Sequence, residues 1–259
     1  MEPRVIYGDA LESLSHLPAH SVDAIVTDPP YCSGGFSEAG RQSAKGQGLR
    51  SETIRADGWF TGDNMGTAGL LFLLRSVALE GLRIARPSGS LLVFLDWRMY
   101  PNVVPALESA GLRYQNLVVW DKGSLGLGTG FRPQHELIAH FTFGAPKYYA
   151  VNESNVIRCK RVPPHYRDHP TQKPVELMER LLSVVCPKGG TVLDPFCGSG
   201  STGVAAKKLG MNFIGVERDR SYTEVTVKRL DAAEVGTQQH LFSTAHEFNE
   251  GVTKDGEEA

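Results

Sequence analysis

The chain has 259 residues, of which 41% are hydrophobic and 22% are charged, and its formal net charge is −2. This composition suits a packed core and excludes a largely disordered chain, a collagen and a coiled coil. Every apolar run, such as Leu91–Leu95, is far shorter than the roughly 18 residues that cross a bilayer, and no basic and apolar leader follows Met1. We therefore expect a soluble, cytoplasmic protein.

The spacing of the cysteines argues against a disulfide framework and against a zinc site. The four cysteines form no C-x-x-C pair and lie far apart, at Cys32, Cys159, Cys186 and Cys197. Neither a disulfide framework nor a zinc site is indicated, so we expect reduced thiols and no metal.

Short β-branched runs alternate with helical patterns along the chain, which is typical of α/β architecture. Seven strands are predicted, at Val5–Tyr7, Ala24–Thr27, Leu91–Leu95, Leu117–Trp120, Leu137–Phe143, Thr191–Leu193 and Phe213–Val216. Helices are predicted after Asp9, over Leu70–Leu82 before Pro87 and Gly89, after Pro174, over Thr202–Leu209, and after a capping box of Ser221 and Glu224. The pattern predicts one mostly parallel sheet with helices on both faces.

Two stretches interrupt this alternation within a single predicted domain at residues 1–242. Residues 33–69 lack apolar periodicity and are expected to form a long loop or insertion. Residues 144–169 form a short segment that contains five basic and two acidic residues. The structural interpretation of such a segment is a solvated surface loop. Residues 243–259 are a polar, acidic tail.

An apolar strand ends in Asp28-Pro29-Pro30-Tyr31. The tetrapeptide places a carboxylate, two rigid residues and an aromatic ring at the carboxyl end of a strand, where ligands bind in open α/β sheets. A proline-rich turn with a surface tyrosine is the structural alternative. The motif alone is suggestive of a site.

A second strand runs into the glycine-rich turn Asp194-Pro195-Phe196-Cys197-Gly198-Ser199-Gly200-Ser201-Thr202, which opens a helix. Glycines let backbone approach a ligand closely, and the amides at a helix start favour an anionic group. No lysine follows Gly198 or Gly200, which argues against a triphosphate-binding P-loop. Glu217 ends a strand about twenty residues past the glycines, where doubly wound folds bind ribose hydroxyls. The predicted ligand is a nucleoside whose tail carries a carboxylate and an amine.

Together with His169-Pro170-Thr171-Gln172-Lys173-Pro174, these blocks resemble the S-adenosylmethionine-dependent DNA amino-methyltransferases. The D-P-P-Y block precedes the glycine-rich block, which resembles the permuted beta-type order of that family. The resemblance implies a Rossmann-like methyltransferase fold, S-adenosylmethionine as cofactor, S-adenosylhomocysteine as product and double-stranded DNA as partner. Relatives often pair as dimers, so a homodimer stays open.

The resemblance also implies roles for residues. The catalytic block is Asp28, Pro29, Pro30 and Tyr31: the Asp28 side chain and the Pro29 carbonyl accept the hydrogens of the target amine, and Tyr31 stacks on the flipped-out base. The implied cofactor-binding residues are Asp9, Ala10, Asp28, Thr171, Gln172, Lys173, Asp194, Phe196, Cys197, Gly198, Ser199, Gly200, Ser201, Thr202, Glu217 and Arg218. Among them Lys173 would hold the carboxylate and Glu217 the ribose, while Asp9 would lie near the adenine or act as a helix N-cap.

D-P-P-Y is the family's usual form for the N6 amine of adenine, and S-P-P-Y is more typical of the N4 amine of cytosine. We therefore predict adenine, with cytosine as the alternative. RNA or protein amide methylation, a non-catalytic binding module and, from the weak Gly198-x-Gly200-x-x-Gly203 spacing, a dinucleotide oxidoreductase are further alternatives.

Family members with this motif order commonly carry a substantial recognition region where this chain has only residues 144–168. Candidate DNA contacts therefore come from the insertion and the basic segment, namely Arg41, Lys45, Arg50, Arg55, Arg158, Lys160, Arg161 and Arg167. A lid over cofactor and base is an equal alternative for the insertion. A short target site or relaxed specificity is the resulting hypothesis.

Overall fold

The computed structural model describes residues 3–30, 66–126, 129–166 and 172–236. Its strands are β1 (Arg4–Tyr7), β2 (Val22–Thr27), β3 (Ala85–Leu95), β4 (Arg113–Asp121), β5 (His135–Thr142), β6 (Val156–Arg158), β7 (Thr191–Asp194) and β8 (Asn212–Glu217). Its helices are α1 (Ala10–Ser15), α4 (Thr67–Ile84), α5 (Tyr100–Glu108), α6 (Val175–Val185), α7 (Ser201–Lys208) and α8 (Arg220–Ala232), with a 3-10 turn at Pro164–Tyr166.

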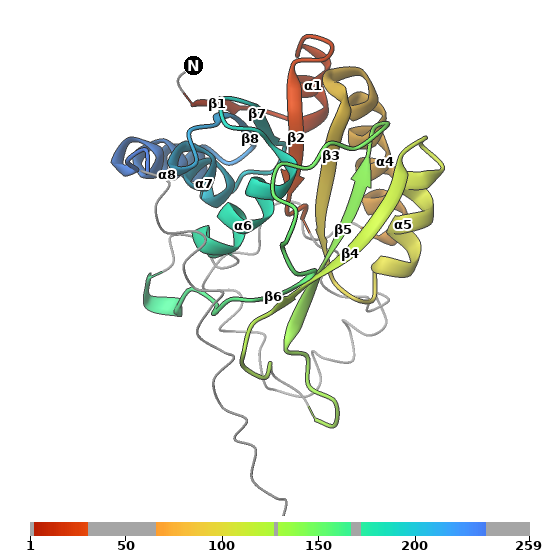
Figure 1. Ribbon diagram of the computed structural model, residues 1–259, viewed down its shortest axis with the longest axis vertical. Coiled ribbons are helices and arrows are strands. Elements are labelled where there is room, and N and C mark those ends of the chain that lie inside the picture. Colours follow the sequence, from red (N-terminus) through yellow and green to blue (C-terminus); the bar gives the residue numbers. More distant parts are fainter. Residues whose placement is uncertain (1–2, 31–65, 127–128, 167–171, 237–259) are drawn as a thin grey trace, which may run out of the picture.

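The strands form one sheet in the order β1-β8-β7-β2-β3-β5-β4-β6. All neighbouring strands pair in parallel except β5, which runs antiparallel to both β3 and β4. Helices α1, α4 and α5 cover one face, and α6, α7 and α8 lie on the other side (Figure 1). The predicted Rossmann-like architecture is therefore confirmed, with eight strands instead of seven.

Strand β2 shows why the sequence adopts this arrangement. All six of its residues are buried, because it lies between β7 and β3 and is covered by helices on both faces. Its Ile25 packs into the core under α4, and its neighbour Val26 packs into the core under α6. A strand buried on both faces reads as a continuous apolar run, as residues 24–26 do.

The connections leave β2 and β7 in opposite directions. The chain passes from β2 through α4 to β3, and from β7 through α7 to β8, on opposite faces of the sheet (Figure 1). The boundary between β2 and β7 is therefore the topological switch point, where open α/β sheets bind ligands at the carboxyl ends of the strands.

Three local predictions were wrong. The edge strand β6 lies inside the segment predicted as a loop, and it is only three residues long, too short for a periodicity signal. Helix α5 was missed because Pro101 and Pro105 interrupt its helical pattern; Pro101 lies in the first turn, where proline is tolerated, and Pro105 lies inside the helix. Helix α8 is capped by Asp219 instead of Ser221, whose hydroxyl donates to the same carboxylate at 2.6 Å.

The predicted insertion at residues 33–69 ends in helix, because α4 already begins at Thr67. The rest of that insertion lies outside the described residues, as does the acidic tail.

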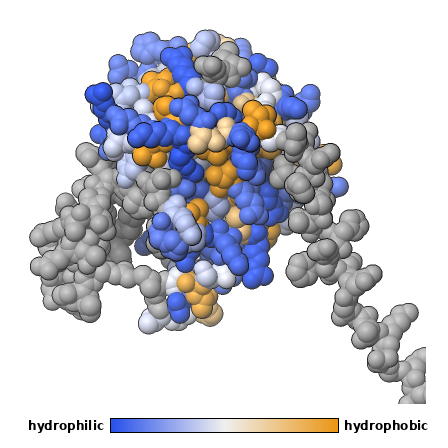
Figure 2. Space-filling view, turned by 90° about the vertical axis from the view of Figure 1, so that its left-hand side faces the viewer, coloured by the Kyte–Doolittle hydropathy of each residue, from blue (hydrophilic) through white to orange (hydrophobic). Residues whose placement is uncertain are grey.

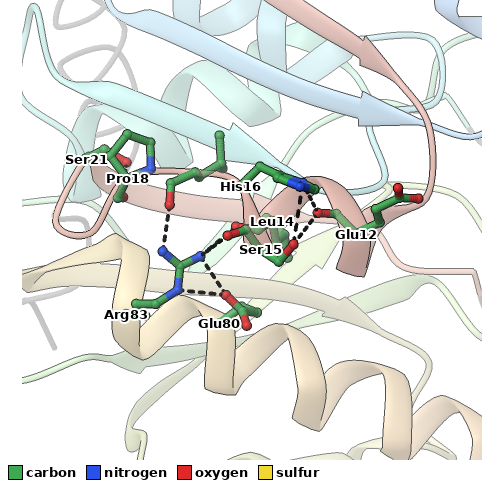
Figure 3. Close-up of polar contacts among 9 residues, drawn as sticks. Glu12, Leu14, Ser15, His16, Pro18, Ser21, Glu80 and Arg83 are labelled. Atoms are coloured by element: carbon green, nitrogen blue, oxygen red, sulfur yellow. Dashed lines mark hydrogen bonds and ion pairs between the residues drawn. The ribbon is translucent and has the colours of Figure 1, made fainter.

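Helix α1 is fixed to α4 by one arginine. The guanidinium of Arg83 donates to the carbonyls of Leu17 at 2.6 Å and Leu14 at 2.7 Å, and it also pairs with Glu80 (Figure 3). The positive charge of Arg83 lies at the C-terminal end of α1, where it interacts favourably with the helix dipole. Because α1 begins next to Asp9, this clamp also fixes one candidate site residue.

The surface over α7 and α8 is mainly hydrophilic, with small hydrophobic patches between charged groups (Figure 2). Val227 and Val235 are exposed on this side of the molecule. Within the described residues, no helix combines the length and apolar character needed to traverse a lipid bilayer.

Candidate active site at the carboxyl edge of the sheet

Four acidic residues stand at or just beyond the carboxyl ends of four neighbouring parallel strands. Asp194 and Glu217 end β7 and β8, Asp28 follows β2, and Asp9 follows β1. Because these strands run in the same direction, the carboxylates share one edge of the sheet. The structure thus brings together residues that the sequence separates by up to 208 positions.

Asp194 joins the two strands at the switch point. One carboxylate oxygen accepts hydrogen bonds from the Thr27 hydroxyl and the Phe196 amide, both at 3.1 Å, and the other accepts from the Thr202 hydroxyl at 2.6 Å. The residue is 3% exposed, and burial raises the pKa of its carboxyl group to about 7 despite these donors. Asp194 therefore fixes the entrance of the glycine-rich turn relative to β2.

Asp194 makes stability depend on pH. Its carboxyl group stays protonated up to about pH 7 in the folded chain but ionises near 4 when the chain unfolds, so its contribution is lost as the pH rises between these values. We expect the melting temperature of Asp194→Asn, relative to the unaltered protein, to rise between pH 4 and pH 8. Thermal unfolding at several pH values measures this difference. An identical difference at every pH would contradict the assignment.

Asp96→Asn provides a control of opposite sign. Burial raises the pKa of Asp96, but hydrogen bonds and charge from Arg98 outweigh it and hold the pKa below its usual value. Asp96 therefore stabilises the fold above the unfolded pKa and loses that contribution as the pH falls. The control variant should lose stability near neutral pH and approach the unaltered protein in acid.

The glycine-rich turn is held from two sides. The Gly198 amide donates to Glu217 at 2.9 Å, so β8 fixes one side of the turn. Helix α8 fixes the other, because the Thr226 hydroxyl donates to the Gly198 carbonyl at 2.7 Å and Arg229 donates to the Ser199 carbonyl at 2.5 Å. Sequence reasoning missed Thr226 and Arg229, since nothing in the pattern of an amphipathic helix indicates which polar residues reach a distant turn.

Glu217 retains capacity for a ligand beyond these backbone contacts. Its second oxygen accepts from the Asp219 amide at 2.8 Å. A carboxylate offers about four acceptor positions, so these backbone donors leave room for a hydroxyl group of a ligand. Burial raises the pKa of Glu217 above its usual value, and the amides of Asp219, Gly198 and Arg218 oppose that shift.

Asp9 acts as the N-cap of α1. One of its oxygens accepts from the amides of Leu11 at 2.9 Å and Glu12 at 3.2 Å. The Gly8 amide donates to the Glu217 carbonyl at 3.0 Å, which keeps this cap beside the end of β8. The predicted cap is confirmed, and its place near an adenine stays a prediction.

Asp28 and Lys173 form a buried ion pair, and the Lys173 side chain is 7% exposed. The same ammonium lies 3.3 Å from Glu136, the second residue of β5. Burial lowers the pKa of Lys173, but the two carboxylates together outweigh it and raise the pKa above its usual value. Lys173, predicted to hold a cofactor carboxylate, thus lies against the predicted catalytic aspartate.

The remaining predicted residues differ in burial, and some lie outside the described part of the chain. Pro29, Ala10, Cys197, Ser199, Gly200, Ser201 and Thr202 are buried, and burial raises the pKa of the Cys197 thiol well above its usual value, as expected of a packing residue. Pro30, Gln172, Phe196 and Gly198 are half-buried, and Arg218 is exposed. Tyr31, Thr171, Arg41, Lys45, Arg50, Arg55 and Arg167 lie outside the described residues.

The basic segment reaches the same edge. Arg158 ends β6 and lies 3.9 Å from Asp121 of β4, with 77% of its side chain exposed. Arg161 donates to the Ser124 hydroxyl at 3.3 Å, and Lys160 is exposed between them. The placement makes these side chains accessible to a polyanion, and their contact with DNA stays a prediction.

The donor and acceptor set fits S-adenosylmethionine. Acidic acceptors at the ends of β1 and β8 suit an adenine amine and ribose hydroxyls, and a glycine turn before α7 permits close backbone approach. Gly198 and Gly200 both have positive φ values, at 51° and 78°, so the turn has a shape that other residues rarely adopt.

Known proteins agree with this architecture. The family model described as DNA methylase matches residues 22–228. The type II methyltransferase M.HpaI of Haemophilus parainfluenzae is 29% identical over 259 residues, which cover 90% of this chain and 75% of the relative.

Two solved structures share the fold. A complex of M1.HpyAVI with SAM has a TM-score of 0.62 at 23% identity, covering 88% of this chain and 98% of that one. The cytosine-N4-specific PvuII DNA methyltransferase has a TM-score of 0.68 at 17% identity, covering 88% and 86%. Because the family model covers most of the sequence, the chain belongs to the DNA methylase family, the S-adenosylmethionine-dependent amino-methyltransferases that act on N6 or N4 of DNA bases.

Proposed function

We propose that this enzyme methylates the exocyclic N6 amine of adenine in double-stranded DNA, with Asp28 as the catalytic acceptor. The observation that carries the proposal is the place of Asp28, which follows β2 at the topological switch point and is held there by Lys173. The D-P-P-Y form of the motif supports adenine. The likeness to a cytosine-specific enzyme concerns the fold and does not distinguish the two bases.

The reaction requires a better nucleophile than a free base provides. The lone pair of an exocyclic amine is delocalised into the ring, so the nitrogen is planar and reacts poorly. The Asp28 carboxylate and the Pro29 carbonyl accept the two amine hydrogens, which favours a tetrahedral nitrogen with a localised lone pair. S-adenosylmethionine would supply an electrophilic methyl group: the N–C bond would form as the S–C bond breaks, S-adenosylhomocysteine would leave, and the nitrogen would lose one proton to solvent, so no covalent intermediate on the enzyme is needed.

The surroundings of Asp28 suit this role. Pro29 is buried and Pro30 half-buried, and proline fixes its own φ, so the two residues hold the Pro29 carbonyl in one direction. The Asp28 side chain is half-buried, at 20% exposed, and pairs with Lys173 at the carboxyl end of β2. Glu217 would hold the ribose, Asp9 would lie near the adenine of the cofactor, and the turn at Phe196–Gly200 would enclose its methionine portion.

Nucleoside mass spectrometry tests the choice of base. Unmethylated duplexes of random sequence are incubated with the enzyme and S-adenosylmethionine labelled in its methyl group, and then digested to nucleosides. We expect the label in N6-methyladenine. Random sequence removes the need to know the target, and sequencing of the methylated fraction then reports how short or relaxed the site is.

The other products have distinct meanings. Label in N4-methylcytosine would keep the site and overturn the choice of base. Label in RNA or protein, offered in parallel reactions, but none in DNA would overturn the proposed substrate.

A further inference from the structure

We propose that Glu136 is a positioning residue for methyl transfer, which acts by keeping Lys173 protonated beside Asp28. This inference rests on the proposed catalytic role of Asp28. Glu136 belongs to neither the glycine-rich nor the D-P-P-Y motif, and in the sequence it directly precedes the strand predicted at Leu137–Phe143.

Four charged groups of alternating sign form a row along the carboxyl edge. Lys122, just after β4, lies 2.6 Å from one oxygen of Glu136. The other oxygen of Glu136 lies 3.3 Å from the Lys173 ammonium, which also pairs with Asp28. Because β5 runs antiparallel to its neighbours, its first residues meet the carboxyl ends of the other strands and bring Glu136 to this edge.

Two carboxylates favour the charged form of Lys173 against its burial. Its side chain is 7% exposed and its ammonium lies 5.0 Å from the centre of the Phe94 ring. Burial of an ammonium favours the neutral amine, and each nearby carboxylate favours the charged form. Glu136 itself is held ionised, because Lys173 and Lys122 lower its pKa although burial raises it.

A charged Lys173 has a consequence for Asp28. The ammonium holds the carboxylate in place, so that it can accept a hydrogen bond from the target amine. A neutral Lys173 would hold the carboxylate less firmly. Other ionisable groups at this edge are Asp194 beside Asp28, and Asp96 with Arg98 beside Lys122.

Glu136→Gln tests the inference, because it removes the charge and keeps the shape. Lys173 then loses one of its two carboxylates and its pKa falls, so the basic limb of the rate profile moves to lower pH. We expect a decrease in kcat of about 10- to 100-fold on the alkaline side of the profile, with the KM for DNA changed by less than about threefold. Glu136→Asp should restore part of the rate.

Two further variants sharpen the test. Lys122→Gln removes a positive charge near Lys173, and Lys173 is then the remaining ion-pair partner of Glu136 among the described residues. The pKa of Lys173 should rise, so the basic limb of the rate profile should move to higher pH. Glu179→Gln is the matched control, because Glu179 of α6 pairs with Lys208 of α7 at 2.6 Å, an ion pair of the same kind elsewhere on the fold. Its pH profile should match that of the unaltered enzyme.

The outcomes distinguish the positioning role of Glu136 from the catalytic role of Asp28. An unmoved basic limb in both Glu136→Gln and Lys122→Gln, with Asp28→Ala inactive, would overturn the role of Glu136 and leave the catalytic assignment intact. Full activity of Asp28→Ala would instead remove the proposed function on which the inference rests. Should Glu136→Gln fail to fold, the direction of the shift in Lys122→Gln decides alone.

Discussion

Replacement of Asp28 by alanine is expected to lower kcat for methyl transfer by about 10²- to 10³-fold. The substitution removes the acceptor that localises the lone pair of the target amine. Lys173 keeps Glu136 as a partner at 3.3 Å, so the buried ammonium stays compensated and the fold should persist. Single-turnover transfer of labelled methyl to DNA measures the effect, with thermal unfolding as the check on folding.

Asp96→Ala is the matched control for this prediction. Asp96 follows β3 at the same edge of the sheet and pairs with Arg98 at 2.6 Å, but it has no proposed contact with base or cofactor. Its rate should stay within about threefold of the unaltered enzyme, the range of ordinary surface effects. Equal rates for both variants would show that Asp28 is not the catalytic acceptor.

Gly200→Ala is expected to damage both stability and cofactor binding. Gly200 has a φ of 78°, and a Cβ atom built there would lie 2.5 Å from the Thr226 methyl group of α8. A left-handed conformation costs other residues about 1–3 kcal/mol, and overpacking adds about 1–3 kcal/mol. We expect the free energy of unfolding to fall by about 2–5 kcal/mol, and the affinity for S-adenosylmethionine to fall at least about tenfold as the turn shifts.

Gly189→Ala separates the two causes. Gly189 has a φ of 76°, but a Cβ atom there would meet nothing within 4 Å. This variant should lose only the stability that belongs to backbone conformation and should bind the cofactor normally. Denaturant unfolding and calorimetric titration of both variants give the comparison. Normal cofactor affinity in Gly200→Ala would show that the turn does not form the cofactor site.

Most features that could be predicted from the sequence were local motifs. The D-P-P-Y and glycine-rich blocks each follow an apolar run, so their places at strand ends follow from the pattern, and the structure confirms this for Asp28, Pro29 and Pro30 and for the glycine-rich turn. The cap at Asp9 was likewise predictable, because an aspartate before an apolar helical pattern satisfies free amides. These features depend on a few neighbouring residues, so they can be predicted from the sequence.

Contacts between distant segments could not be predicted in the same way. Glu136 reaches Lys173 only because β5 is antiparallel, and no local pattern indicates the direction of a strand. Arg229 reaches the glycine turn because α8 packs beside it, and its helical position resembles that of any surface arginine. These contacts depend on the order and direction of the strands in the sheet. The same order therefore determines which charged groups surround Asp28, the predicted catalytic residue.

A crystal structure with S-adenosylhomocysteine tests the central claim most directly, namely that methyl transfer takes place at the carboxyl edge between β2 and β7. The account predicts the ribose hydroxyls on Glu217, the amino acid portion against the Phe196–Gly200 turn, and the sulfur atom facing Asp28. Density for the cofactor product anywhere else, or a sulfur atom directed away from Asp28, would contradict it.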